Sequence, residues 1–100
     1  MAIWSSEGPD GELTIKIQGH FDFSAHQEFR DAYEKSPGDS KGYVVDMKEA
    51  TYLDSSALGM LLLLRDHAGG DSSSIEIINC NPDVKKILTI SNFEQLFVIK

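Results

Sequence analysis

The sequence TYLDSSALGMLLLLRDHAGG, residues 51–70, places an acidic residue and two serines directly before a run of leucine, methionine and alanine. The two glycines after that run are typical of a helix C-terminus. Asp54 and Ser55 both suit the N-cap, because either side chain can accept hydrogen bonds from free backbone N–H groups of a first turn. The pattern predicts a helix over residues 54–68.

The elements on either side of this helix alternate between strand and helix patterns. Short apolar or alternating runs predict strands at residues 2–4, 12–18, 42–47, 74–80 and 97–99. A helix is predicted from Ser24, where Gln27 completes a capping box, to Pro37. Another is predicted from Asn81 to Ser91. This order predicts an α/β fold, with a mixed, mostly parallel sheet of four to five strands and helices packed mainly on one face.

Length and charge narrow the class of protein. A chain of 100 residues predicts one domain over residues 1–100. The net charge of -7, from 16 acidic and 9 basic residues, argues against binding to nucleic acid or to an anionic membrane. Cys80 is the only cysteine, which favours a reducing compartment and a small buried side chain at a strand end. No segment has the pattern of a signal peptide or the length of a membrane span, so we expect a cytoplasmic protein.

The polar residues around the predicted helix include side chains that could take part in catalysis. The candidates are two serines as nucleophiles and three histidines as bases, namely Ser55, Ser56, His20, His26 and His67. The G-x-S-x-G pattern of a nucleophile elbow is absent, and His67 would lie about three turns along the helix from Ser55. A metal site made of His20, Asp22 and His26 lacks a second pair of ligands. We therefore expect neither enzymatic activity nor a metal or other cofactor.

The residues before the predicted helix, Asp54, Ser55 and Ser56, are suited to regulation by phosphorylation. A serine at a helix N-terminus is a good phosphate acceptor, because free N–H groups and the helix dipole stabilise the added charge. On a helical wheel, Ala57, Leu61, Leu64 and Ala68 share one face, Leu58 and Leu62 form a neighbouring stripe, and Met60 and Leu63 point elsewhere. One face of the helix must cover the sheet. Apolar side chains left outside that face would form a surface for a partner, and the alternative is a helix buried on nearly all sides.

Several segments together are similar to one family. The segment LDSSALGMLLLL at residues 53–64 resembles the D-S-[ST]-[GA]-[LI]-G signature of STAS domains, specifically the bacterial anti-sigma-factor antagonists. GHFDFSA at 19–25 is similar to the family's loop between a strand and its first helix. NPDVKKILTISNFEQLFVI at 81–99 resembles its closing helix and strand. The similarity covers residues 12–100, with Ala57 standing where glycine is commoner.

The resemblance implies a partner-switching role in bacterial signal transduction and transcription regulation. The unphosphorylated domain would bind an anti-sigma factor or switch-protein serine kinase, phosphorylation would release it, and a PP2C-type serine phosphatase would reverse the modification. By position in the motif, the acceptor is Ser55, with Ser56 as the weaker alternative. Asp22, Asp54 and Ser56 would surround the phosphorylated residue.

The resemblance and the apolar helix together predict the surface that a partner contacts. The residues expected there are Ala57, Leu58, Met60, Leu61, Phe23 and Ser24. A different function is also compatible with the family. Some STAS domains are permanent accessory subunits of a larger complex such as a transporter ATPase, and there the serine would act only as a helix cap.

Overall fold

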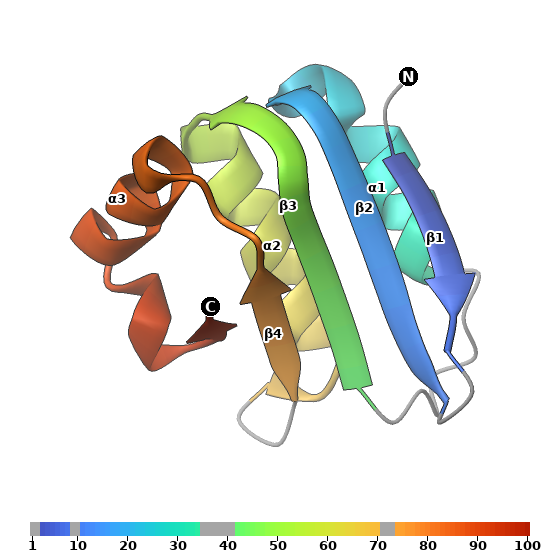
Figure 1. Ribbon diagram of the computed structural model, residues 1–100. Coiled ribbons are helices and arrows are strands. Elements are labelled where there is room, and N and C mark those ends of the chain that lie inside the picture. The colour runs from blue at the N-terminus through green and yellow to red at the C-terminus, as the bar shows by residue number, and fades with distance from the viewer. Residues whose placement is uncertain (1–2, 9–10, 35–41, 71–73) are drawn as a thin grey trace.

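The computed structural model describes residues 3–8, 11–34, 42–70 and 74–100 (Figure 1). Along the chain the elements are β1 (Ile3–Glu7), β2 (Glu12–Phe21), the 3-10 helix η1 (Phe23–Ala25), α1 (His26–Glu34), β3 (Gly42–Leu53), α2 (Ser55–His67), β4 (Ile75–Ile78), α3 (Pro82–Ile90), the 3-10 helix η3 (Phe93–Gln95) and β5 (Val98–Ile99). The strands lie in the order β1-β2-β3-β4-β5. β1 is antiparallel to β2 and the other pairs are parallel, so the predicted fold class is confirmed.

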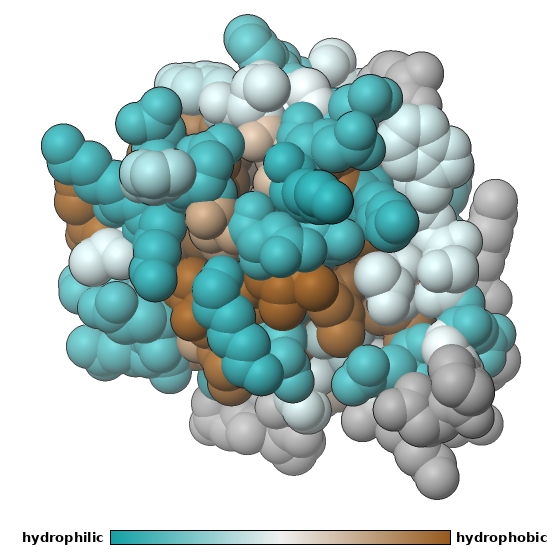
Figure 2. Space-filling model, viewed as in Figure 1, coloured by the Kyte–Doolittle hydropathy of each residue, from teal (hydrophilic) through white to brown (hydrophobic). Residues whose placement is uncertain are grey.

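The core lies between the sheet and the helices α1 and α2, which cover one face of it (Figure 1). α3 flanks the side of the molecule that holds β4 and β5. Ile15, Val45 and Ile77 stand side by side on neighbouring strands, and all three are fully buried against the helices. The opposite face of the sheet is mostly hydrophilic in Figure 2, with hydrophobic atoms visible between the polar side chains.

β2 and β3 are longer than the sequence pattern predicted. β2 continues to Phe21 instead of residue 18, and β3 continues to Leu53 instead of residue 47. Two register shifts interrupt their pairing, so the apolar alternation on which the prediction relied breaks before the strands end. The extension brings the ends of both strands to the first turn of α2.

The start of the first helix differs from the prediction. Asp22, rather than Ser24, is the N-cap, and its carboxylate accepts a hydrogen bond of 2.9 Å from the Ser24 backbone N–H. One 3-10 turn follows before α1 begins at His26. Gln27 does not complete a capping box, because its side-chain amide donates to Asp31 one turn later. The predicted end of this helix at Pro37 lies outside the described residues.

The C-terminal part follows the prediction closely. Asn81 caps α3 by accepting a 2.8 Å hydrogen bond from the Val84 N–H, and Pro82 opens the helix. The Asn81 side-chain amide also donates to the Ala50 carbonyl of β3 at 2.9 Å, which ties α3 to the sheet. Cys80 is half-buried rather than buried. In the described part of the chain, no helix has the length and apolar character to cross a membrane.

Candidate functional site

The site is built where β2 and β3 end. Phe21 and Leu53 are paired in parallel register at the carboxyl ends of these strands, and an aspartate follows each of them. The Asp54 N–H donates to the Phe21 carbonyl at 3.4 Å, which joins the two turns. Asp22 and Asp54 therefore lie on neighbouring turns at the carboxyl ends of β2 and β3.

Asp54 organises the first turn of α2. Its carboxylate accepts hydrogen bonds from the Ala57 N–H at 3.0 Å and from the Ser56 hydroxyl at 2.6 Å. These bonds, that from Ser56 foremost, lower the pKa of Asp54 below its usual value because they stabilise the charged carboxylate. Of the two caps that the sequence allowed, the structure uses Asp54.

The two serines after Asp54 have different surroundings. Ser55 is the first residue of α2 and is exposed, and its hydroxyl forms no hydrogen bond within the described ranges. Ser56 is half-buried, and its hydroxyl is held by the Asp54 carboxylate. The hydroxyl of Ser55 at the helix N-terminus is thus unengaged, whereas the hydroxyl of Ser56 already donates to Asp54.

The neighbouring turn after β2 exposes an aromatic side chain. Asp22 uses its carboxylate to hold the backbone and hydroxyl of Ser24. Between them, Phe23 is 67% exposed and stacks on His26, with ring centroids 5.2 Å apart. This turn therefore adds an exposed apolar ring, backed by an imidazole, to the surface near Ser55.

The apolar residues of α2 divide between the core and the surface. The buried side chains of α2 are those of Ala57, Met60, Leu61 and Leu64, and the first three were expected to contact a partner. The prediction that Ala57, Met60 and Leu61 contact a partner is thus corrected, because these side chains are covered by the sheet and α1. Leu58 is half-buried, whereas Leu62 and Leu63 are 41% and 51% exposed.

Leu62 and Leu63 were missed when the contact surface was predicted from the sequence. The helical wheel did carry the signal, since it placed them off the face shared by Leu61 and Leu64. The exposed apolar side chains on α2 and on the turn after β2 are Leu62, Leu63 and Phe23, and Leu58 on α2 is half-buried. We call these four residues the α2 surface.

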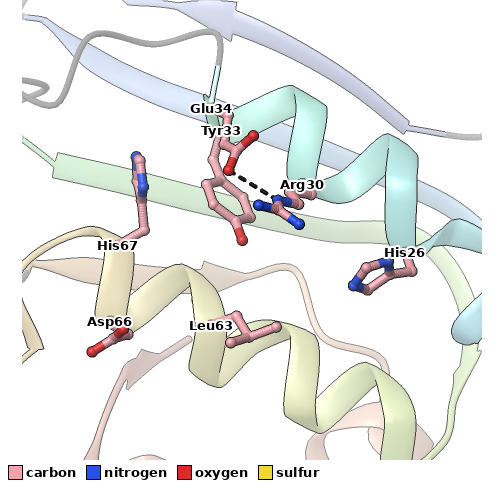
Figure 3. Close-up of a pocket in the computed structure, with 7 residues that line it drawn as sticks. All are labelled: His26, Arg30, Tyr33, Glu34, Leu63, Asp66 and His67. Atoms are coloured by element: carbon pink, nitrogen blue, oxygen red, sulfur yellow. Dashed lines mark hydrogen bonds and ion pairs between the residues drawn. The ribbon is translucent and has the colours of Figure 1, made fainter.

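A groove of about 300 Å³ runs between α1 and α2 (Figure 3). Its lining is mainly polar and consists of His26, Arg30, Tyr33, Glu34, Leu63, Asp66 and His67. Arg30 is already paired with Glu34 at 2.9 Å, the interaction dashed in Figure 3. Because Leu63 belongs both to the groove and to the α2 surface, a partner that covers one also reaches the other.

The histidines do not form a catalytic arrangement with the serines. Each lies against an aromatic ring: His20 against Tyr52, His26 against Phe23, and His67 against Tyr33 and Tyr43. Over residues 3–8, 11–34, 42–70 and 74–100, no hydrogen bond joins a histidine to Ser55 or Ser56. The same ranges hold no group of three or more ligating side chains suited to a metal ion. The site offers the exposed hydroxyl of Ser55 and several exposed apolar side chains.

Comparison with known proteins agrees with this fold. The family model described as "Mlab, STAS domain" matches residues 4–99. A STAS-domain containing protein of Pseudomonas aeruginosa (strain UCBPP-PA14) is 66% identical over 100 residues, covering 99% of each chain.

Solved structures of anti-sigma-factor antagonists share the architecture. A putative antagonist from Thermotoga maritima superposes with a TM-score of 0.83 at 11% identity, over 97% of this chain and 84% of that one. The antagonist SpoIIAA in its unphosphorylated form gives a TM-score of 0.73 at 14% identity, over 99% and 87%. SpoIIAA from Bacillus in its phosphorylated form gives 0.68 at 13% identity, over 99% and 91%. With the sequence motifs, the sheet order and the family match all in agreement, this chain belongs to the STAS-domain family.

Proposed function

We propose that this protein is an anti-sigma-factor antagonist that works by partner switching. In this proposal, the unphosphorylated chain binds an anti-sigma factor or switch-protein kinase through the α2 surface. Phosphorylation of Ser55 releases that partner, and a PP2C-type phosphatase restores binding. The chain itself is a substrate of these enzymes and catalyses no reaction.

The observation that carries the proposal is the exposed, unengaged hydroxyl of Ser55 at the N-terminus of α2. A kinase would transfer the terminal phosphoryl group of ATP to this oxygen, forming a new P–O bond, leaving ADP and releasing the hydroxyl proton. Ser56 is a poorer acceptor, because its hydroxyl is half-buried and donates to Asp54 at 2.6 Å. The similarity in fold to SpoIIAA, whose structures include both phosphorylated and unphosphorylated forms, also favours the proposal.

Electrostatics explain how a phosphate could release a partner without refolding the domain. A phosphoserine carries about two negative charges, which the N-terminus of a 13-residue helix tolerates. A partner packed against Ser55 would have to bury those charges beside the carboxylates of Asp22 and Asp54. Each loss of about 1.4 kcal/mol weakens binding tenfold, so a modest penalty is enough to end the association.

The α2 surface gives the partner an apolar contact next to the switch. Phe23 and Leu63 are the most exposed of its side chains; Phe23 lies on the turn next to the start of α2, and Leu63 lies about two turns along α2 from Ser55. Exposed aromatic and aliphatic groups of this kind are typical centres of protein interfaces. Ser55 and these side chains therefore lie on one helix and the turn next to it, so a single partner would cover both.

The test begins with wild-type protein isolated from its native cells, followed by mass spectrometry of the Ser55 peptide. We expect a fraction that carries one phosphoryl group, lost in Ser55→Ala and retained in the matched control Ser56→Ala. Partners captured on the wild type are then measured for binding to Ser55→Ala and Ser55→Asp. We expect full affinity for the alanine variant and at least about tenfold weaker binding for the aspartate variant.

Two outcomes would contradict the proposal. A phosphate found on Ser56 alone would move the acceptor by one position. An unmodified protein whose partner binds Ser55→Asp as tightly as wild type would favour a permanent accessory subunit, for example of a transporter ATPase. In that case Ser55→Asp should change only the stability of the domain, because Ser55 would have no regulatory role.

A further inference from the structure

The edge strand β1 is a second surface whose features point to a partner. β1 is the first strand in the sheet order and pairs only with β2, so among the described residues no strand covers its outer side. Its register with β2 is continuous from the pair Ile3–Ile17 to the pair Glu7–Leu13, without a bulge. It contains neither lysine nor proline, which proteins commonly use to block pairing at such an edge.

The side chains of β1 also leave the edge accessible. Trp4 is 51% exposed, and Ser5 and Ser6 are exposed and small. In Figure 2 the surface over β1 is pale, in contrast to the strongly hydrophilic side chains that cover much of the rest of this face. A flat, regular and weakly polar edge is suited to the addition of another strand.

A pocket of about 300 Å³ lies between this edge and α1. Ile3, Trp4 and Ser5 form one wall, and the other is made by Glu28, Asp31 and Ala32 of α1. The only ionisable groups in the lining are the two carboxylates. Asp31 accepts a hydrogen bond from the neutral Gln27 amide at 2.9 Å, and no ion pair joins either carboxylate to a described residue.

We propose that β1 binds an extended, basic segment of a partner protein, which adds to the sheet as a sixth strand. Backbone hydrogen bonds to β1 would hold the segment. Because side chains alternate across a strand, every second residue would face the pocket, where lysine or arginine would meet Glu28 and Asp31, while the residues between them would lie on the face of the sheet that holds the Trp4 ring. A second copy of this chain suits the edge poorly, since β1 is itself without a basic residue and each chain carries a net charge of -7.

This surface is separate from the proposed phosphorylation switch. It is formed by β1 and the outer side of α1, whereas Ser55 and most of the α2 surface belong to α2. The two proposals can therefore fail independently. A change at Ser55 should leave binding at β1 intact, and a change in the edge pocket should leave phosphorylation of Ser55 intact.

The test uses a capped nine-residue peptide in which lysine alternates with threonine and valine. Trp4 is the only tryptophan, so its fluorescence reports binding at the edge directly, and amide NMR shifts locate the contact. We expect saturable binding with the largest shifts in β1. The same peptide with glutamate in place of lysine should not bind. Methylation of alternate backbone nitrogens, made in both registers, should abolish binding in one of them, because strand addition needs those donors.

The variant Glu28→Gln with Asp31→Asn removes the charge of the pocket while keeping its shape. We expect it to weaken binding of the lysine peptide by about tenfold or more. The matched control, Glu49→Gln with Glu94→Gln, makes the same change in net charge at exposed positions elsewhere and should bind as wild type. Ser55→Asp should also bind as wild type.

Two results would overturn the proposal that β1 binds a basic strand. Equal binding of both methylated peptides, or equal weakening by both pairs of charge variants, would mean a diffuse electrostatic attraction and would overturn the proposal. Dimers in sedimentation experiments with NMR shifts centred on β1 would mean that a second copy occupies the edge, which would also overturn it.

Discussion

Replacing single leucines of α2 by alanine separates the core of this protein from its proposed contact surface. Leu61 is fully buried and Leu62, the next residue, is 41% exposed, so the two substitutions remove the same atoms from opposite environments. Leu61→Ala should lower the free energy of unfolding by about 3 kcal/mol, the sum of lost burial and a cavity. For a chain of this length that corresponds to a fall in Tm of roughly 12 to 24 °C.

Leu62→Ala should lower the free energy of unfolding by less than about 1 kcal/mol, because its side chain is 41% exposed and its removal leaves no closed cavity. Leu63→Ala, at 51% exposure, should behave the same way. The assay is urea unfolding followed by far-UV circular dichroism, with the slope of the transition used to check that unfolding remains two-state.

Partner binding should show the reverse order. Folded Leu61→Ala should retain its affinity for a partner captured on the wild type, whereas Leu62→Ala and Leu63→Ala should weaken it. A loss of more than about 1.5 kcal/mol of stability in Leu62→Ala, or of less than about 1 kcal/mol in Leu61→Ala, would refute the division of α2 into a buried and an exposed face.

Three further predictions follow from single interactions. Asn81→Ala removes a helix cap and the bond to Ala50, so it should cost about 2 kcal/mol in urea unfolding. Asn81→Asp keeps the cap and should cost about half of that. Equal costs would mean that the cap contributes nothing, and no cost for Asn81→Asp would mean that the Ala50 bond contributes nothing. The pKa of Asp54 is lowered, so the contribution of its charged carboxylate to stability is present at neutral pH and is lost as the pH falls below the usual aspartate pKa of about 3.9. Ser56→Ala should raise the pKa of Asp54 in an NMR titration, because it removes the main hydrogen bond to the carboxylate. An unchanged pKa would contradict this cause. Burial raises the pKa of the Cys80 thiol, so less of it is thiolate at pH 8. Folded protein should therefore react with iodoacetamide more slowly than urea-unfolded protein. Equal rates would contradict the raised pKa.

Local patterns in the sequence were enough to predict much of the fold. Asn81 followed by Pro82 predicted the start of α3 correctly, because capping depends on neighbours along the chain. The alternation of Leu13, Ile15 and Ile17 predicted a strand with one buried face for the same reason. The prediction failed where distant contacts decide, as at the far ends of β2 and β3, which pair through register shifts that no local pattern carries.

The candidate site could likewise be predicted from the sequence only in part. The family resemblance predicted Ser55 as the acceptor, with Asp22 near it, from their positions in a motif, and the structure places Asp22 and Asp54 on adjoining turns. The motif could not distinguish the environments of Ser55 and Ser56. That difference depends on which hydroxyl reaches the Asp54 carboxylate, and therefore on the geometry of the first helical turn.

The sequence by itself determined the element order, the family and the position of Asp54 directly before α2, since each depends on residues close together in the chain. Only the tertiary structure decided which leucines of that helix are available to a partner. Burial depends on what packs against each side: the sheet and α1 cover Leu61 and Leu64, and nothing in the described structure fully covers Leu62 and Leu63. A helix that is apolar on nearly every side therefore serves both as core and as surface.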